Sequence, residues 1–202
     1  MNINKGLNHL SNVDPKMAKL VIKYEKPSFK KETNHFEAII RSIIYQQLST
    51  QSASKIHGRF KELFVRSSIS PQNILDNSLD IYRNVGLSRQ KVSYIINVSN
   101  AFKDRLIPKD LNKFSDEDII DILIKIKGVG RWTAQMFLMF TLNRPDVLPE
   151  LDLGIKKGFK VYFKLKQLPS DAYMKKKAEI WRPHRTLACW YLWRLVEGPF
   201  EW

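Results

Sequence analysis

The chain has 202 residues, 44% of them hydrophobic, and its 34 Lys and Arg outnumber its 20 Asp and Glu to give a formal net charge of +14. This apolar fraction is too high for a disordered basic tail, and the charge favours a polyanionic partner. A single cysteine, Cys189, excludes an internal disulfide, a multi-cysteine zinc site and an iron–sulfur cluster, and it fits a reducing compartment. Because charged residues interrupt the first twenty positions and no apolar run approaches roughly 18 residues, we expect a soluble protein without a signal peptide.

Helix-start patterns recur from the N-terminus onward. Asp14-Pro15 opens an apolar run through Tyr24, and Asn34 followed by Glu37 resembles a capping box. Apolar residues then recur at helical spacing, namely Phe36, Ile39, Ile40, Ile43 and Ile44. Both segments are therefore predicted to be helices.

The middle of the chain repeats this punctuation. Ser70 precedes a short predicted helix, Ser88 a long one, and Ser115 a segment with an apolar face. Two glycines at 128 and 130 stop that segment before another helix from Arg131 to Leu142. The pattern over about 116–142 therefore predicts helix, tight hairpin, helix.

Three more helices are expected after the hairpin. The first starts near Asp152, and the other two cover about 171–180 and about 184–196. Strand-like alternation is almost absent, so the predicted fold class is all-α. Basic residues gather between Ile155 and Arg185, where ten of them accompany two acids for a net charge of +8. Such a run is usually a solvated face, but one this one-sided favours phosphate contact.

Glycines at a hairpin let the backbone approach a ligand closely, and the following helix presents N–H groups without intrahelical partners. A phosphate could bind there. When Gly128 and Gly130 are taken alone, an ordinary glycine turn between antiparallel helices is the favoured interpretation.

Further motifs accompany the hairpin in a fixed order. They are RSIIYQQLS at 41–49, GLSRQK at 86–91, IKGVGRWTA at 126–134, DVLPELDLG at 146–154, WRPHR at 181–185 and ACWYLW at 188–193. Together they resemble the helix-hairpin-helix DNA glycosylases with a Gly/Pro-rich loop and a following Asp, and among these the 3-methyladenine DNA glycosylase II branch. The resemblance covers roughly residues 34 to 196.

The resemblance implies two helical lobes around a cleft: a central lobe of residues 36–146 containing the hairpin, and a second lobe of 1–35 plus 147–202. The chain is too short for the extra N-terminal β-rich domain of longer bacterial members, so only the glycosylase core is expected. Lys127 stands where the family hairpin often has Pro, which matters little to a loop that acts through backbone groups.

By the same resemblance, Asp152 is the catalytic carboxylate. Departure of a base leaves an oxocarbenium-like sugar, which an ionised carboxylate can stabilise while also orienting water. The plainer interpretation of an Asp before a helix is an N-cap.

The resemblance also implies a base pocket of Trp132, Met136 and Trp193, on whose aromatic rings an electron-deficient alkylated base would stack. Gln47 falls where a side chain wedges into the gap left by the flipped nucleotide. The competing interpretations are core packing for the tryptophans and a surface position for Gln47, with Gln46 supporting the fold.

DNA phosphates are assigned by the resemblance to the backbone of Gly128 and Gly130, with Thr133, Lys156 and Lys157 as further contacts. No cofactor or catalytic metal is expected. A Na⁺ or K⁺ held by the carbonyls of Lys127 and Val129 is plausible when DNA is bound.

The resemblance implies that the protein is a monofunctional DNA glycosylase of base excision repair. Its expected reaction is the flipping and excision of 3-methyladenine- and 7-methylguanine-type purines from duplex DNA by hydrolysis of the N-glycosidic bond. Bifunctional relatives carry a Schiff-base Lys where this chain has Trp132, so no strand cleavage by that route is expected. The alternatives are another base specificity (hypoxanthine, uracil or an oxidised purine) or a non-enzymatic DNA-binding module. A monomer is expected, in the cytoplasm of a prokaryote or the nucleus of a eukaryote.

Overall fold

The computed structural model describes residues 1–30 and 32–198, and over these residues the chain forms twelve α-helices and two short 3-10 helices with no strand. This confirms the predicted all-α class. No helix in the described ranges is long and apolar enough to cross a bilayer. The chain divides into two compact units, Glu32–Phe137 and Met1–Lys31 with Leu138–Trp202. The lobes expected from the sequence, 36–146 and the remainder, stay a prediction.

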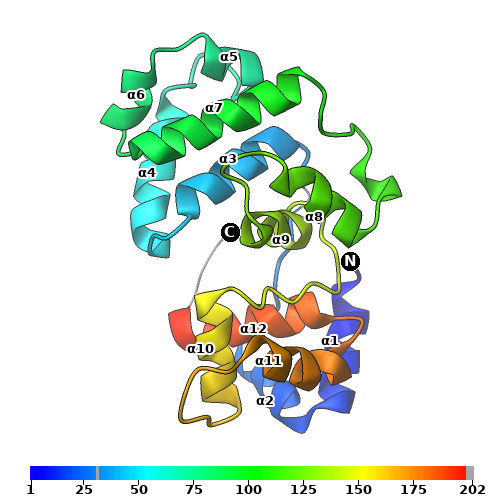
Figure 1. The fold of residues 1–202 in the computed structure, drawn as a ribbon. Coiled ribbons are helices and arrows are strands. Elements are labelled where there is room, and N and C mark those ends of the chain that lie inside the picture. The colour runs from blue at the N-terminus through cyan, green and yellow to red at the C-terminus, as the bar shows by residue number, and fades with distance from the viewer. Residues whose placement is uncertain (31, 199–202) are drawn as a thin grey trace. The chain divides into compact units, whose positions relative to one another are not determined.

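The continuous unit Glu32–Phe137 is built around α7, which packs against both α3 and α5 (Figure 1). Its helices are α3 (His35–Tyr45), α4 (Thr50–Glu62), α5 (Pro71–Leu75), α6 (Leu79–Asn84), α7 (Arg89–Lys103), η1 (Leu111–Lys113) and α8 (Asp116–Ile124). Helix α9 (Arg131–Phe140) follows, and its last three residues belong to the other unit.

The predicted caps start these helices. The Asn34 side chain accepts the Glu37 N–H at 3.1 Å, and Ser115 forms a capping box with Asp118. Helices α1 (Ile3–Val13), α4 and α6 were not predicted. In α4 only Ala53 and Phe60 are buried, so its sequence lacks the regular apolar face that marks α3.

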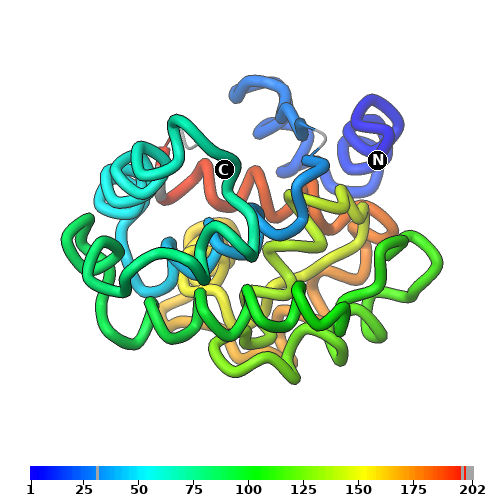
Figure 2. The backbone as a smooth tube through the Cα atoms, turned by 90° about the horizontal axis from the view of Figure 1, so that it is seen from above, coloured from blue at the N-terminus to red at the C-terminus, as the bar shows by residue number. Residues whose placement is uncertain are grey.

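The discontinuous unit combines α1 (Ile3–Val13) and α2 (Pro15–Lys23) with four later elements: α10 (Leu153–Tyr162), α11 (Asp171–Ala178), η2 (Glu179–Trp181) and α12 (Arg185–Glu197). Helices α10 and α12 lie side by side (Figures 1 and 2). Gly158 makes this close approach possible, because a Cβ there would lie 2.8 Å from the carbonyl oxygen of Leu192.

Asp14 ties the N-terminal helices to the C-terminal ones. Its Oδ1 accepts the backbone N–H groups of Lys16 and Met17, which caps α2, while Oδ2 accepts the Tyr162 hydroxyl at 2.7 Å and the Trp181 indole N–H at 2.9 Å. A buried carboxylate is stable only when donors satisfy it, as they do here. The first thirty residues, which contribute little to the resemblance, thus complete the core of this unit.

Candidate active site and nucleic-acid interface

Asp152 stands at the N-cap of α10, where its half-buried carboxylate has a fixed orientation. Oδ1 accepts the backbone N–H of Ile155 at 2.7 Å and the indole N–H of Trp193 at 2.9 Å. The capping role and a chemical role are therefore compatible: the bonds that start the helix also hold the carboxylate. The carboxylate also lies at the N-terminal end of α10, which is the positive end of the helix dipole.

The loop that leads to Asp152 is anchored on the start of α12. Arg185 donates from Nε to Asp146 Oδ1 at 2.7 Å, and Arg182 donates from Nη1 to Asp146 Oδ2 at 2.7 Å. The Thr186 hydroxyl accepts the Val147 N–H and donates to the carbonyl of residue 144. Arg182 and Arg185 belong to one of the sequence motifs, but the motif alone did not indicate that their side chains hold this loop.

Trp193 is buried, with 5% of its surface exposed, and its ring centroid lies 5.8 Å from that of Phe140. The sequence suggested either a base pocket or core packing for this residue. The structure adds a third element, the bond from its indole N–H to Asp152. A base-pocket role stays a prediction.

In the continuous unit, the hairpin between α8 and α9 contains two glycines with different surroundings. Gly128 has φ +106°, and a Cβ there would overlap the ring of Tyr94. At Gly130 a Cβ would meet no atom within 4 Å. Gly128 is therefore required by the fold of the loop, whereas the space beside Gly130 is open.

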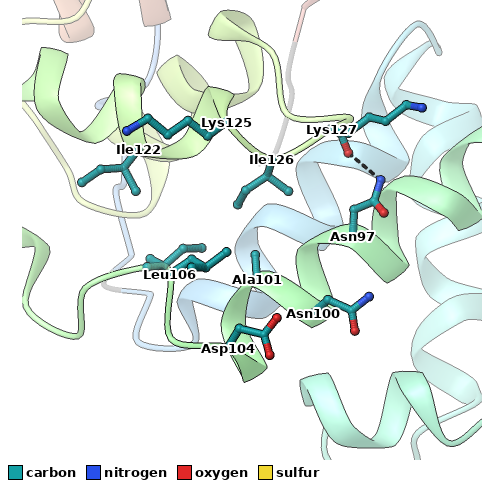
Figure 3. Close-up of a pocket in the computed structure, with 10 residues that line it drawn as sticks. Asn97, Asn100, Ala101, Asp104, Leu106, Ile122, Lys125, Ile126 and Lys127 are labelled. Carbon is teal, nitrogen blue, oxygen red and sulfur yellow. Dashed lines mark hydrogen bonds between the residues drawn. The ribbon is translucent and has the colours of Figure 1, made fainter.

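Two amide side chains support this hairpin. Gln46 Nε2 donates to the Gly128 carbonyl at 3.0 Å and to the Thr133 hydroxyl at 2.9 Å. From α7, Asn97 Nδ2 donates to the Lys127 carbonyl at 3.0 Å (Figure 3). Thr133 is buried at 2% exposure, so its side chain links the first turn of α9 to Gln46. A phosphate contact by Thr133, and a cation at the Lys127 and Val129 carbonyls, stay predictions.

The other expected site residues of this unit differ in exposure. Trp132 is half-buried, Met136 is buried at 1% exposure, and Gln47 is exposed with φ +56° in the turn after α3. The structure thus gathers Asp152 and Trp193 within one compact unit, and the hairpin, Trp132, Met136 and Gln47 within the other.

Several basic residues of the 155–185 run have acidic partners. Lys156 pairs with Asp171 at 2.9 Å, whereas Lys157 is exposed. Arg182 and Arg185 both bind Asp146, and the Arg185 side chain is only 12% exposed. The run is therefore not one uniform phosphate-binding surface: its arginines hold a loop, and some of its lysines pair with acids.

A pocket of about 470 Å³ lies beside the hairpin (Figure 3). Its lining combines carboxamide, carboxylate and amine groups with an apolar floor: Asn97, Asn100, Ala101, Asp104, Leu106, Ile107, Ile122, Lys125, Ile126 and Lys127. Of the expected site residues only Lys127 contributes to it. In the described part of the chain, no three His, Cys, Asp or Glu residues gather as metal ligands.

Residues 40–183 match the family model described as HhH-GPD superfamily base excision DNA repair protein. This range includes the hairpin, the loop that leads to Asp152 and the turn after α3. The chain belongs to this superfamily. A relative from Schizosaccharomyces pombe, DNA-3-methyladenine glycosylase 1, is 35% identical over 95% of this chain and 87% of its own length. The DNA-3-methyladenine glycosylase of Saccharomyces cerevisiae is 27% identical over 96% of this chain and 79% of its own.

Two solved structures share the fold of this chain. A 3-methyladenine DNA glycosylase from S. pombe in complex with abasic DNA superposes with a TM-score of 0.88 at 34% identity, over 98% of this chain and all of that one. A DNA-3-methyladenine glycosidase from Bacillus halodurans gives a TM-score of 0.78 at 28% identity, over 95% of this chain and 89% of the other.

Proposed function

We propose that this protein is a 3-methyladenine DNA glycosylase of base excision repair, which hydrolyses the N-glycosidic bond of alkylated purines in duplex DNA. The observation that carries the proposal is the Asp152 carboxylate, held by Trp193 and the start of α10 in an HhH-GPD chain. Similarity to 3-methyladenine glycosylases over nearly the full chain supports the substrate class.

Asp152 supplies what this reaction needs. Breaking the bond to the base develops positive charge on the sugar, and a fixed carboxylate beside it stabilises that charge more than it stabilises the neutral ground state. An alkylated purine is already cationic and leaves readily, so one carboxylate suffices without a strong general acid. Water then adds to the sugar carbon, and the products are the free base and an abasic site.

The reaction is proposed to stop at the abasic site. Strand cleavage through a Schiff base requires an amine nucleophile, and the second residue after the hairpin, Trp132, has none. Appreciable strand cleavage by the purified protein, without added base or amine, would contradict this part of the proposal.

For DNA binding, the backbone at Gly130 and the start of α9 are proposed to bind a phosphate. Lys157, which is exposed and follows Asp152 closely in the sequence, is proposed as a further phosphate contact. A Na⁺ or K⁺ at the Lys127 and Val129 carbonyls would neutralise the same phosphate. Trp132 and Met136 are proposed to line the base pocket, and Gln47 to fill the vacated stack.

The decisive experiment compares wild type with Asp152→Asn on duplexes containing 3-methyladenine, 7-methylguanine, hypoxanthine or uracil. The asparagine keeps an oxygen that can cap α10 but loses the charge, so we expect base release to fall on the order of 100-fold or more while the melting temperature changes little. Asp80→Asn, on the exposed face of α6, is the matched control and should retain full activity.

Each competing function gives a different result in this assay. Release of only hypoxanthine or uracil would replace the alkylated-purine specificity with another. Salt-dependent DNA binding without release of any base would favour a binding module. Unchanged release by Asp152→Asn would reject the mechanism.

A further inference from the structure

The C-terminal end of α3 is closed by a lysine from another helix. Lys91, in the first turn of α7, donates from Nζ to the carbonyls of Ile44 at 2.7 Å and Gln46 at 2.8 Å. The last carbonyls of a helix lack intrahelical partners and form its negative end, so a cation there satisfies both needs. Burial lowers the pKa of Lys91, as expected for a lysine drawn into the protein to reach backbone oxygens.

The same turn contacts the hairpin through Gln46. Its amide nitrogen donates to the Gly128 carbonyl and to the Thr133 hydroxyl, residues more than eighty positions away in the chain. Gln46 therefore touches the hairpin loop and the first turn of α9 at once. Lys91 fixes the backbone of Gln46, and Gln46 fixes the hairpin.

The next residue along the chain is Gln47, which has a left-handed backbone conformation at φ +56° and an exposed side chain. Such a conformation is costly for a residue other than glycine and persists only where its surroundings hold it. The residue before it, Gln46, is held at both its backbone and its side chain: Lys91 donates to its carbonyl, and its own amide donates to the Gly128 carbonyl. These bonds supply the restraint.

We propose that Lys91 and Gln46 form a brace that holds the Gln47 turn at a fixed spacing from the hairpin. This inference rests on the proposed function, in which Gln47 enters the duplex and the hairpin binds the backbone of the same DNA. Base flipping needs both contacts in register, and small misplacements in such arrangements reduce rates by up to about 100-fold. Both residues are positioning residues, because they act through Gln47 and the hairpin rather than on the reacting bond.

The test uses the full chain with Lys91→Met and Gln46→Met, which keep the approximate shape of each side chain and remove its N–H donors. Lys91→Arg retains donors and is the conservative variant. Lys103→Met, at the exposed end of the same helix α7, is the matched control. Gln46→Glu, which also lacks the amide donor, replaces Gln46→Met if the latter does not fold.

The first measurement is amide hydrogen exchange in the protein without DNA. We expect Lys91→Met to speed exchange at residues 127–131 as well as at 46–48, although Lys91 donates to α3 carbonyls rather than to the hairpin. Lys103→Met should leave both segments as in wild type. Unchanged exchange at the hairpin in both Lys91→Met and Gln46→Met would overturn the brace.

The second measurement is single-turnover base release from two duplexes, one with the lesion paired normally and one with it opposite an abasic site, where flipping is easier. We expect the Met variants to lose about 10- to 100-fold on the paired duplex and clearly less on the other, with Lys91→Arg restoring most activity. An equal loss on both duplexes would overturn the positioning role. If wild type released no base while the exchange result held, the proposed function would fail and the brace would stand, because exchange is measured without DNA.

Discussion

The indole N–H of Trp193 donates a hydrogen bond that orients Asp152. Trp193→Phe keeps an aromatic ring in the same buried position but removes this donor. A hydrogen bond to a charged group contributes about 1.5–3 kcal/mol, so we expect single-turnover base release to slow by roughly 10- to 100-fold with little change in DNA affinity. Trp190→Phe on the same helix is the matched control. A larger effect on DNA affinity than on the rate would instead favour a base-pocket role for the ring.

His57 should make the protein sensitive to acid. Burial, followed by the charges of Arg41 and Lys61, lowers its pKa from 6.5 to about 4 in the folded protein. Between these values the unfolded chain binds a proton that the folded protein does not, so stability falls as the pH drops from 6.5 towards 4. Because the side chain is partly exposed, we expect this loss to be at most roughly 2 kcal/mol.

His57→Gln tests this prediction, because glutamine keeps polarity without titrating. Urea unfolding at several pH values between neutrality and pH 4 should show a smaller loss of stability in the variant than in wild type. Identical pH dependence of the two proteins would assign the acid sensitivity to other groups.

At the scale of elements, the two hairpin glycines are expected to have different roles: Gly128 is needed for the fold of the loop, and Gly130 is proposed to be needed for DNA binding. Gly128→Ala forces a side chain into a left-handed residue and against Tyr94, so we expect a destabilisation of about 2–4 kcal/mol, measurable as a lower melting temperature. In Gly130→Ala the added methyl group has no atom of the protein within 4 Å, so the variant should have a melting temperature close to that of wild type.

Gly130→Ala should nevertheless bind abasic DNA more weakly, because the added methyl group would occupy the space proposed for a phosphate. Wild-type affinity in this variant would show that the phosphate lies elsewhere. The pair of substitutions thus distinguishes a loop needed for the fold from a loop needed for DNA.

The sequence predicted elements where a local cause was present. Helix caps such as Asn34 and Ser115 act on groups only a few residues away, as do the glycines of the hairpin. Such signals can therefore be recognised from the sequence alone. Helix α4 was missed because its few buried residues give no clear period, and α1 because its burial depends on partners from the end of the chain, such as His184 and Leu187 near Gly6.

Candidate site residues divide in the same way. Asp152 could be selected as a candidate because a motif surrounds it, and the structure shows which groups hold its carboxylate. The bonds from Trp193, Gln46 and Arg185 could not, since each joins residues about forty or more positions apart. Such partners become visible only when the helices that carry them are packed together.

At the scale of the whole molecule, the net charge of +14 predicts salt-dependent DNA binding, but its basic residues should contribute unequally. Lys157→Gln removes an exposed charge and should lower the slope of log affinity against log salt by about 0.9, without affecting stability. Arg185→Gln removes one of the two arginines that bind Asp146, and because Arg182 remains we expect a loss of stability of about 1.5–3 kcal/mol. Equal salt slopes for Lys157→Gln and wild type would place the DNA away from α10.

The discontinuous unit also has a consequence for synthesis. A ribosome completes residues 32–137, with the hairpin, before it makes α12, whereas α1 and α2 must wait for partners that come last in the chain. Asp152 emerges earlier than Trp193 and the arginines that hold its loop. We therefore expect a nascent chain to fold the hairpin that is proposed to contact DNA before it completes the surroundings of Asp152, so that early intermediates could bind DNA without releasing a base from it.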